Sequence, residues 1–259
     1  MYVRPWLRKG NFLTNVNRRG NRALARDAGA VFSAAIVSAI VLPGIIPAAV
    51  LGQIRARLAI GPFVSGKTSA VGGAASIKEN VMLAIDSPTE REAVELLAGA
   101  LQASAAFQVA AWPDAMMRPM FCRYGVGGKY GDHVDAAIMG EAASPLRCDV
   151  AMTVCLNDPS EYDGGELVID TAGVPRSWKG NAGDAIVYPA DTLHRVSEVT
   201  RGARDVAVTW IQSMVREPER RRILFDLRSV LDAFDASASP PPATETLRRS
   251  YLNLMRMWA

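Results

Sequence analysis

The sequence predicts an α+β fold in which a barrel or sandwich of short strands lies between N-terminal helices and C-terminal helices. The first observation is a series of short β-forming runs separated by Gly, Pro and Asp turns, at residues 107–112, 117–124, 150–156, 166–169, 185–188 and 206–211. The second is helical spacing of apolar residues on both sides of that region. The length of 259 residues and the hydrophobic content of 49% suit one large domain with appendages.

The N-terminal segment differs in composition from the rest of the chain. Residues 1–27 carry seven Lys and Arg residues but a single acid, Asp27, which predicts a basic, disordered extension over residues 1–30. Residues 28–53 carry no charge, so a targeting or membrane segment is an alternative. Pro43, Gly44 and Pro47 interrupt this apolar run and favour a soluble, cytoplasmic protein without a membrane anchor.

Helices are predicted before the strand region. Leu51, Ile54 and Leu58 share a helical spacing over residues 47–58, and residues 77–85 are expected to form a short helix. A longer helix is predicted from residue 87 to about residue 105, because Ser87 can cap it and Pro88 suits its first turn. Glu90 would complete a capping box with Ser87.

Two further helices are predicted after residue 214. One begins at Pro218 and carries an apolar face that includes Leu224 and Leu231, and the other begins near Thr244. They are expected to pack on the strand domain or on a second subunit, which makes a homo-oligomer possible. The predicted organisation is therefore an extension at residues 1–30, a domain at residues 31–214 and a helical region at residues 215–259.

The chain contains only two histidines, His133 and His194, and the first belongs to a His-x-Asp sequence ending at Asp135. On an extended strand, residues two positions apart point to the same side, so His133 and Asp135 can reach one metal ion. Two imidazoles and one carboxylate form the facial triad that holds non-haem Fe(II) and leaves coordination positions open. Each histidine taken alone would also fit a structural role.

Arg204 follows His194 by ten residues and begins a predicted strand. A guanidinium binds a carboxylate through two parallel hydrogen bonds, so Arg204 can anchor an acidic cosubstrate. A surface arginine in a basic run with Arg195 and Arg201 is the alternative. The net charge of +3 does not indicate a nucleic-acid partner, and three cysteines without a Cys-x-x-Cys pair predict neither disulfides nor a zinc site.

One motif points to a different chemistry. Gly61-Pro-Phe-Val-Ser-Gly-Lys67-Thr68 matches the phosphate-loop pattern, which functions only between a buried strand and the N-terminus of a helix. The residues around it predict the end of a helix and a glycine-rich loop. A nucleotide-binding protein is therefore a remote alternative.

Several motifs follow one another along the chain. They are Tyr124-x-x-Gly127-x-x-Tyr130-x-x-His133-x-Asp135, Asp163-Gly-Gly-Glu-Leu167, Gly183-Asp-Ala-Ile-Val-Tyr-Pro189, His194-Arg-Val, Gly202-Ala-Arg204, Trp210-Ile-Gln-Ser-Met-Val-Arg216 and Leu254-Met-Arg-Met-Trp258. In this order they resemble prolyl-4-hydroxylase-type oxygenases, and more closely the PKHD-type hydroxylases of the Fe(II)- and 2-oxoglutarate-dependent dioxygenase superfamily. The resemblance covers roughly residues 41–258.

This resemblance implies a double-stranded β-helix, or jelly-roll, core with iron ligands His133, Asp135 and His194. It also implies a 2-oxoglutarate anchor at Arg204, with Tyr124 and Tyr130 as candidates for lining the cosubstrate pocket. The implied reaction consumes O₂ and hydroxylates an unactivated C–H bond with release of succinate and CO₂, and L-ascorbate is the expected reductant. The expected substrate is a small molecule or a peptidyl side chain. A catalytically silent metal-binding jelly roll is the main alternative.

Overall fold

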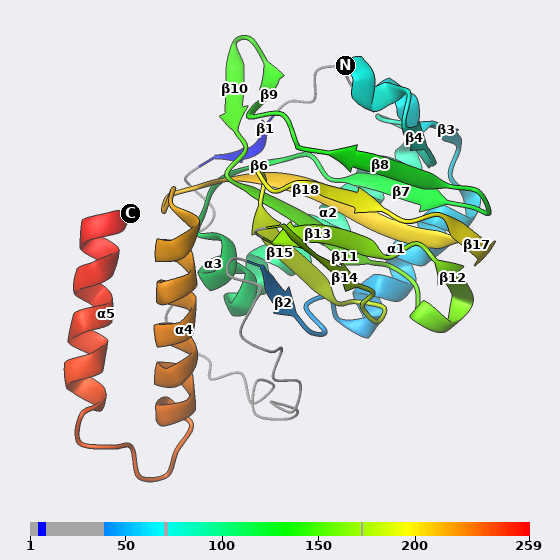
Figure 1. Ribbon diagram of the computed structural model, residues 1–259. Coiled ribbons are helices and arrows are strands. Elements are labelled where there is room, and N and C mark those ends of the chain that lie inside the picture. Colours follow the sequence, from blue (N-terminus) through cyan, green and yellow to red (C-terminus); the bar gives the residue numbers. More distant parts are fainter. Residues whose placement is uncertain (1–4, 9–38, 70–71, 172) are drawn as a thin grey trace.

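The computed structural model describes residues 5–8, 39–69, 72–171 and 173–259 (Figure 1). Two antiparallel sheets face each other, helices cover one of them, and a helical hairpin extends from one end. The arrangement is mixed helix and antiparallel sheet and is consistent with a jelly roll. It brings strands that are distant in sequence to the two sides of one interior.

The larger sheet has nine strands in the described part of the chain. Seven follow the order β2-β15-β11-β18-β7-β5-β3, and β6 joins β18 to β1. Their bounds are β1 Pro5–Arg8, β2 Ile40–Leu42, β3 Phe63–Ser65, β5 Val81–Leu83, β6 Pro113–Met117, β7 Met120–Tyr124, β11 Val150–Cys155, β15 Ala185–Pro189 and β18 Arg204–Ser213. The central strand β11 is buried along its whole length, because its two faces meet different parts of the core.

The smaller sheet has five strands in the order β14-β13-β16-β8-β4. Their bounds are β4 Lys78–Glu79, β8 Lys129–His133, β13 Leu167–Thr171, β14 Val174–Trp178 and β16 His194–Val196. Two short ribbons complete the strands, one formed by β9 Ile138–Glu141 with β10 Ser144–Arg147 and one by β12 Tyr162–Gly164 with β17 Val199–Gly202. Strands β8 and β16 are neighbours, so the two histidines come from adjacent strands.

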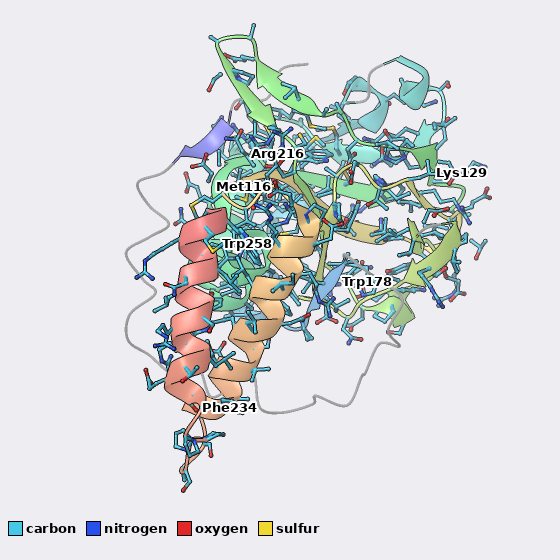
Figure 2. All side chains as sticks on the ribbon, turned by 60° about the vertical axis from the view of Figure 1, so that its left-hand side comes forward. Met116, Lys129, Trp178, Arg216, Phe234 and Trp258 are labelled. Atoms are coloured by element: carbon cyan, nitrogen blue, oxygen red, sulfur yellow. The ribbon has the colours of Figure 1, made fainter. Side chains whose placement is uncertain are left out.

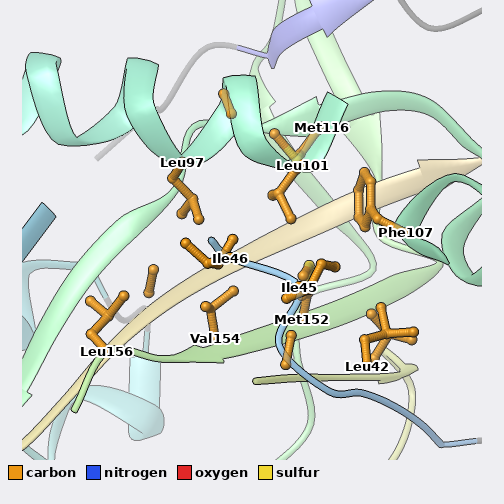
Figure 3. Packing of buried hydrophobic residues seen from close by; sticks show 14 of the residues in the cluster. Leu42, Ile45, Ile46, Leu97, Leu101, Phe107, Met116, Met152, Val154 and Leu156 are labelled. Carbon is orange, nitrogen blue, oxygen red and sulfur yellow. The ribbon is translucent and has the colours of Figure 1, made fainter. Parts of the chain in front are cut away.

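Three helices cover the outer face of the larger sheet: α1 Ala48–Ile60, α2 Pro88–Ala103 and α3 Ala105–Ala111. Figure 3 shows Leu97 and Leu101 of α2 above Met152 and Val154 of β11, and all four side chains belong to one buried cluster. In the described part of the chain, short 3₁₀ turns lie at Gly66–Ser69, Gly72–Ala75 and Pro159–Glu161. This apolar layer leaves the opposite face of the larger sheet free to form the interior between the sheets.

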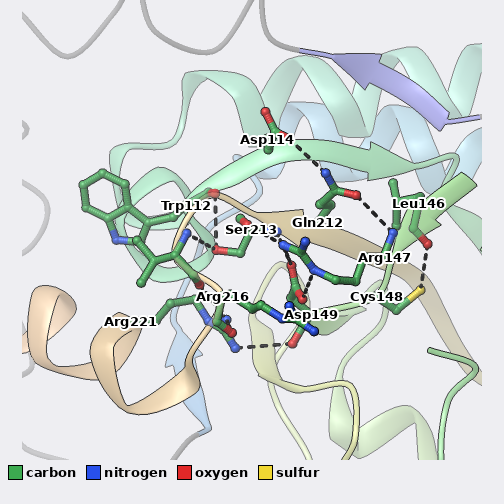
Figure 4. A network of polar contacts seen from close by, with 11 residues as sticks. Trp112, Asp114, Leu146, Arg147, Cys148, Asp149, Gln212, Ser213, Arg216 and Arg221 are labelled. Atoms are coloured by element: carbon green, nitrogen blue, oxygen red, sulfur yellow. Dashed lines mark hydrogen bonds and ion pairs between the residues drawn. The ribbon is translucent and has the colours of Figure 1, made fainter. Parts of the chain in front are cut away.

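The C-terminal helices α4 Pro218–Asp235 and α5 Thr244–Trp258 stand side by side beyond the edge of the sheets (Figures 1 and 2). They share a small apolar cluster with Trp112 and Val215. A buried polar network fixes the start of α4 (Figure 4): Arg221 donates to the carbonyl oxygens of Val215 at 2.8 Å and Asp149 at 3.3 Å. The Asp149 carboxylate in turn accepts from Arg147 at 2.7 Å, so the hairpin is tied to β10 and β11.

Two secondary-structure predictions are wrong. Residues 77–85, expected to be helical, form β4 and β5, because pairing with β8 and with β3 and β7 satisfies their backbone groups. Residues 107–112, expected to be a strand, lie mostly in α3, which begins where the Ser104 hydroxyl accepts from the Phe107 N–H at 3.2 Å. In both segments, tertiary context overrides the local pattern.

The prediction for α2 is confirmed with one correction. The Ser87 hydroxyl accepts from the Glu90 N–H at 3.2 Å, and Pro88 is the first helical residue. The Glu90 carboxylate, however, accepts from the Asp86 N–H at 3.2 Å and pairs with Arg118, so Ser87 receives no reciprocal bond.

The predicted N-terminal extension lies almost entirely outside the described residues. Within its range the structure describes only Pro5–Arg8, which pair with β6 as strand β1. Among the described helices, none is by itself long and apolar enough to cross a bilayer; α2 and α3 meet that test only as a pair bent by 84°.

Candidate metal centre

A cavity of about 510 Å³ lies between the two sheets. Its walls come from β7, β11, β15 and β18 of the larger sheet and from β4, β8 and β16 of the smaller one, with β9 at one side. This volume falls within the range of roughly 300–1,000 Å³ that is usual for small-molecule sites. Apolar side chains dominate the lining, and a few polar and charged groups converge inside it.

The cavity contains the three residues expected to bind a metal. His133 ends β8, His194 begins β16, and the two are opposite each other in the strand pairing with ring centroids 4.2 Å apart. Asp135 lies two residues beyond the end of β8, and its Oδ2 is 3.9 Å from His194 Nε2. One ligand atom from each residue lies within 4.8 Å of the others, so the three side chains can hold one metal ion.

Backbone carbonyls determine which imidazole nitrogens face the cavity. The Nδ1 atom of His133 lies 2.7 Å from the Gly131 carbonyl oxygen, and that of His194 lies 2.9 Å from the Thr192 carbonyl oxygen. A carbonyl oxygen can only accept, so each Nδ1 carries the proton. In the neutral imidazole, Nε2 then carries the lone pair, which is the form that binds a metal.

Burial sets the charge of these ligands. Burial and the neighbouring His194 lower the pKa of His133 to about 4, so its imidazole is neutral at pH 7. Burial raises the pKa of Asp135, and His194, the indole of Trp210 and Lys78 act in the opposite direction. Asp135 is thus a buried carboxylate beside two imidazoles, and a divalent cation bound there would stabilise its charged form.

Aromatic rings hold the two imidazoles in place. Tyr130 stacks on His133 with ring centroids 3.6 Å apart and an interplanar angle of 20°. Tyr188 meets His194 edge-on at 5.2 Å. These contacts restrict rotation of both ligand rings. Tyr130 is expected from the sequence to line a cosubstrate pocket, and the structure places it in the cavity against the His133 imidazole.

Arg204 begins β18 and is paired with Tyr124 of β7, and both side chains line the cavity. Its side chain is 2% exposed, and the guanidinium lies 5.3 Å from the Tyr124 ring. No carboxylate in the described residues forms an ion pair with Arg204. A buried guanidinium without a counter-ion is unfavourable, so this position favours an anionic ligand.

The turn at Gly165 makes room for Arg204. Gly165 has a φ of +69°, and a Cβ atom there would lie 2.9 Å from Val199 Cγ2, 3.1 Å from Arg204 Cδ and 3.3 Å from Tyr162 Cε2. The Asp-Gly-Gly motif therefore shapes the wall next to the guanidinium. The sequence indicated this motif by resemblance only, because the close approach depends on how β12 lies against β18.

Sequence reasoning missed Lys78, Tyr188 and Trp210 as residues of the cavity. Lys78 was included in a predicted helix, and a lysine on a strand normally points to solvent. Tyr188 and Trp210 were treated only as parts of β-forming motifs.

The phosphate-loop motif has no cradle for a phosphate. Lys67 pairs with Glu79 at 2.6 Å, and both side chains are about half exposed. The Gly66 N–H donates to the Asn80 carbonyl oxygen at 2.9 Å. A 3₁₀ turn follows instead of an α-helix, so the geometry that the motif requires is missing.

The fold and the site define a class of protein. Residues 119–212 match the family described as the 2OG-Fe(II) oxygenase superfamily, and this range contains His133, Asp135, His194 and Arg204. The chain is also 40% identical to a PKHD-type hydroxylase of Picosynechococcus sp. over 84% of this chain and 98% of that protein. It is 42% identical to one of Methylobacterium nodulans over 84% of this chain and 97% of that protein.

The chain therefore belongs to the PKHD-type hydroxylases and is an Fe(II)- and 2-oxoglutarate-dependent dioxygenase. A prolyl hydroxylase of Trichoplax adhaerens, solved in complex with a peptide fragment of the hypoxia inducible factor oxygen degradation domain, has a similar fold. Its TM-score is 0.52 at 13% identity, covering 73% of this chain and 90% of that chain.

Proposed function

We propose that His133, Asp135 and His194 bind the catalytic Fe(II) on one face and leave its remaining positions open. The observation that carries this assignment is the convergence of the three side chains within 4.8 Å, with both Nε2 lone pairs free. Bound Fe(II) supplies the redox chemistry that couples O₂ and 2-oxoglutarate to hydroxylation of a C–H bond, with release of succinate and CO₂. The protein orients the ligands through the Gly131 and Thr192 carbonyls and excludes water by burying the site.

Arg204 is proposed to bind the carboxylate of 2-oxoglutarate that lies away from the metal. Its burial without an ion-pair partner among the described residues supports this role. Tyr124 is proposed to line the same pocket, because it is paired with Arg204 and its ring faces the guanidinium. Tyr130 is proposed to contact the cosubstrate near the metal while it holds the His133 ring. L-ascorbate, expected from the family resemblance, is proposed as the reductant that keeps iron ferrous.

The strand order supports a double-stranded β-helix. Four strands of the larger sheet, β7, β18, β11 and β15, would face β8, β16, β13 and β14 of the smaller one. We propose that this core belongs to a domain at residues 31–214 and that residues 215–259 form a helical region. Its exposed surface is a candidate for contact between subunits. We further propose a cytoplasmic enzyme without a nucleic-acid partner, acting on a small molecule or a peptidyl side chain.

A spectroscopic titration tests the proposed site. Fe(II) is added anaerobically to the apoprotein, followed by 2-oxoglutarate, and the visible metal-to-ligand charge-transfer band is recorded. The wild type is expected to give the band, and His194→Ala to lose it because one ligand is gone. Arg204→Met is expected to bind Fe(II) but to need about 100-fold more 2-oxoglutarate, since about 2–3 kcal/mol of a buried charge-assisted contact is lost.

The controls separate the enzyme from a silent metal-binding jelly roll. Arg195→Met removes a nearby arginine that is exposed and paired with Asp132, so it should leave the titration unchanged. A folded wild-type protein without the band would refute the iron and cosubstrate site. An Arg204→Met protein with wild-type 2-oxoglutarate affinity would refute only the role of Arg204.

A further inference from the structure

The cavity contains a second buried cation that neither the metal ligands nor the cosubstrate anchor uses. Lys78 of β4 is 5% exposed and lines the same cavity. Its register partner is Tyr130, and its Nζ atom lies 4.9 Å from the centre of the Tyr130 ring. The Tyr130 ring also stacks on the His133 ring. One tyrosine ring therefore separates the ammonium from a proposed iron ligand.

The ammonium of Lys78 is held in position without being neutralised. Nζ donates to the Ser69 hydroxyl at 2.8 Å, and that hydroxyl donates onward to the Gly66 carbonyl oxygen at 2.8 Å. An ammonium has three N–H bonds, and these contacts occupy one by hydrogen bonding and one by facing a ring. No carboxylate in the described residues pairs with Lys78, and Asp27 is the only acidic residue in the ranges outside them.

With Fe(II) and 2-oxoglutarate bound, the positive charge of Lys78 is the one that the other groups of the cavity do not balance. Fe(II) and the Asp135 carboxylate together carry one positive charge, and Arg204 adds a second. The two carboxylates of 2-oxoglutarate balance these. Of the other titratable groups in the lining, Arg118 is already paired with Asp86 and Glu90, and burial raises the pKa values of Cys122 and Tyr124, which keeps them neutral. One positive charge in a desolvated wall is left without a counter-ion.

The chemistry of the missing counter-ion follows from this balance and from the lining. A single unpaired ammonium matches a group with one negative charge, and a phosphate of nearly two charges would leave the cavity negative. The rest of the wall includes Ile85, Met117, Met120 and Val208. A short apolar molecule with one carboxylate fits both features. Lys78 lines the cavity and is almost fully covered on its other sides, so a ligand would reach it from the cavity.

We propose that Lys78 binds the carboxylate of the molecule that is hydroxylated, so that the substrate is a small, largely apolar organic acid. This inference rests on the proposed function, because the charge balance includes Fe(II) and 2-oxoglutarate. Lys78 positions the substrate through its carboxylate, and the apolar side chains of the lining would contact its carbon chain. Arg204 and Lys78 thereby bind two different carboxylates within one cavity.

Calorimetry on the anaerobic protein saturated with Fe(II) and 2-oxoglutarate tests this assignment. The titrants are short aliphatic carboxylic acids, each compared with its neutral primary amide. We expect wild-type protein to bind at least one acid about tenfold or more tightly than its amide, a ratio that corresponds to about 1.4 kcal/mol. Lys78→Met, which keeps the stem and removes the charge, is expected to reduce that ratio to about one.

A matched control and a second variant accompany the test. Lys67→Met removes a nearby lysine that is exposed and paired with Glu79, and it should keep the wild-type ratio. Lys78→Gln provides a polar, uncharged alternative should Lys78→Met not fold. It should also bind the acid and its amide with about equal affinity. Both Lys78 variants are expected to keep the charge-transfer band with a 2-oxoglutarate dissociation constant within about threefold of wild type.

The outcomes distinguish this inference from the proposed function. A wild-type band without any preference for acid over amide refutes the inference and leaves the iron site intact. An acid preference that survives in both Lys78 variants refutes it as well. A large rise in the 2-oxoglutarate dissociation constant in these variants would assign Lys78 to the cosubstrate. Absence of the band in folded wild-type protein would instead refute the proposed function on which the charge balance depends.

Discussion

Two lysines of this protein differ strongly in their expected contribution to stability. Lys67 and Lys78 are eleven residues apart, yet the first is exposed and paired while the second is buried without a carboxylate partner in the described residues. A paired surface ammonium contributes little to stability. A buried unpaired ammonium destabilises the fold and is retained only where something else, here a ligand, benefits from it.

The first prediction concerns the stability of the Lys78→Met protein without ligands. Burial lowers the pKa of Lys78 below 10.5, so the unfolded chain binds this proton more tightly than the folded one. The folded state is therefore penalised at neutral pH, and the penalty disappears as the pH rises toward 10.5. Lys78→Met should raise the free energy of unfolding by about 1 kcal/mol at pH 7, and by less as the pH approaches 10.5.

Urea denaturation at neutral pH and at the alkaline end of the stable range measures both values. Lys67→Met serves as the comparison and should change stability by less than about 0.5 kcal/mol at either pH. A Lys78→Met protein that is less stable than wild type at pH 7 would show that the contacts to Ser69 and Tyr130 outweigh the burial of charge.

Turns and helices show how elements position the site. The turn after β12 has to pass close to Arg204, and Gly165 permits this with its positive φ and missing side chain. Gly165→Ala is expected to weaken 2-oxoglutarate binding by about tenfold, because the added methyl group displaces the guanidinium. It should also cost about 1–2 kcal/mol of stability through backbone strain, with Fe(II) binding unchanged.

Gly173→Ala provides the control for backbone strain. Gly173 has a φ of +85°, and a Cβ atom there would meet nothing within 4 Å. This variant should therefore lose a similar amount of stability and retain wild-type 2-oxoglutarate affinity, as measured by the charge-transfer titration. Equal affinities in the two variants would contradict the packing role assigned to Gly165.

The helix α4 presents two neighbouring aliphatic residues in opposite environments. Leu224 is 0% exposed within the cluster shared by α4, α5 and Trp112, and Ile223 is 45% exposed. Leu224→Ala is expected to cost about 2–4 kcal/mol of unfolding free energy, because it leaves a cavity between the hairpin and the sheet domain. Ile223→Ala should cost less than about 1 kcal/mol, and denaturation curves of the pair would show whether the hairpin unfolds together with the sheets.

At the scale of the whole molecule, the ligands proposed to bind in the cavity contact residues of both sheets. The proposed iron ligands belong to the side of the smaller sheet, and Arg204 belongs to the larger one. A metal ion and 2-oxoglutarate together should therefore join the two sheets. At about 100 times its dissociation constant, each ligand contributes about 2.7 kcal/mol to the stability of the folded state.

This linkage predicts a rise in melting temperature of roughly 5–10 °C when anaerobic Fe(II) is added to apoprotein, and a further rise with 2-oxoglutarate. Arg204→Met should show the first rise without most of the second, and His194→Ala should show neither. Scanning calorimetry measures these shifts. A 2-oxoglutarate shift of equal size in the absence of metal would contradict the proposal that the cosubstrate binds through iron.

Much of the site could be predicted from local sequence. The pair of histidines, the His-x-Asp spacing and the arginine ten residues after His194 identified the residues that the structure brings together. The cap at Ser87 and the start of α4 at Pro218 were also predictable. The His-x-Asp spacing, the cap and the helix start depend on chemistry within a few residues, so they are present before the chain adopts its tertiary structure.

Other features were decided only by the tertiary structure. The segment containing Lys78 has no local preference that places its ammonium inside, and pairing of β4 with β8 determines that direction. Residues 107–111 have a composition suited to a strand, and packing beside α2 and α4 makes them helical. The sequence by itself therefore determined the proposed metal ligands and the proposed cosubstrate anchor, through their residue types and through the short spacings from His133 to Asp135 and from His194 to Arg204. The tertiary structure decided which further charge faces the cavity, because the direction of a side chain on a strand depends on the neighbours with which that strand pairs.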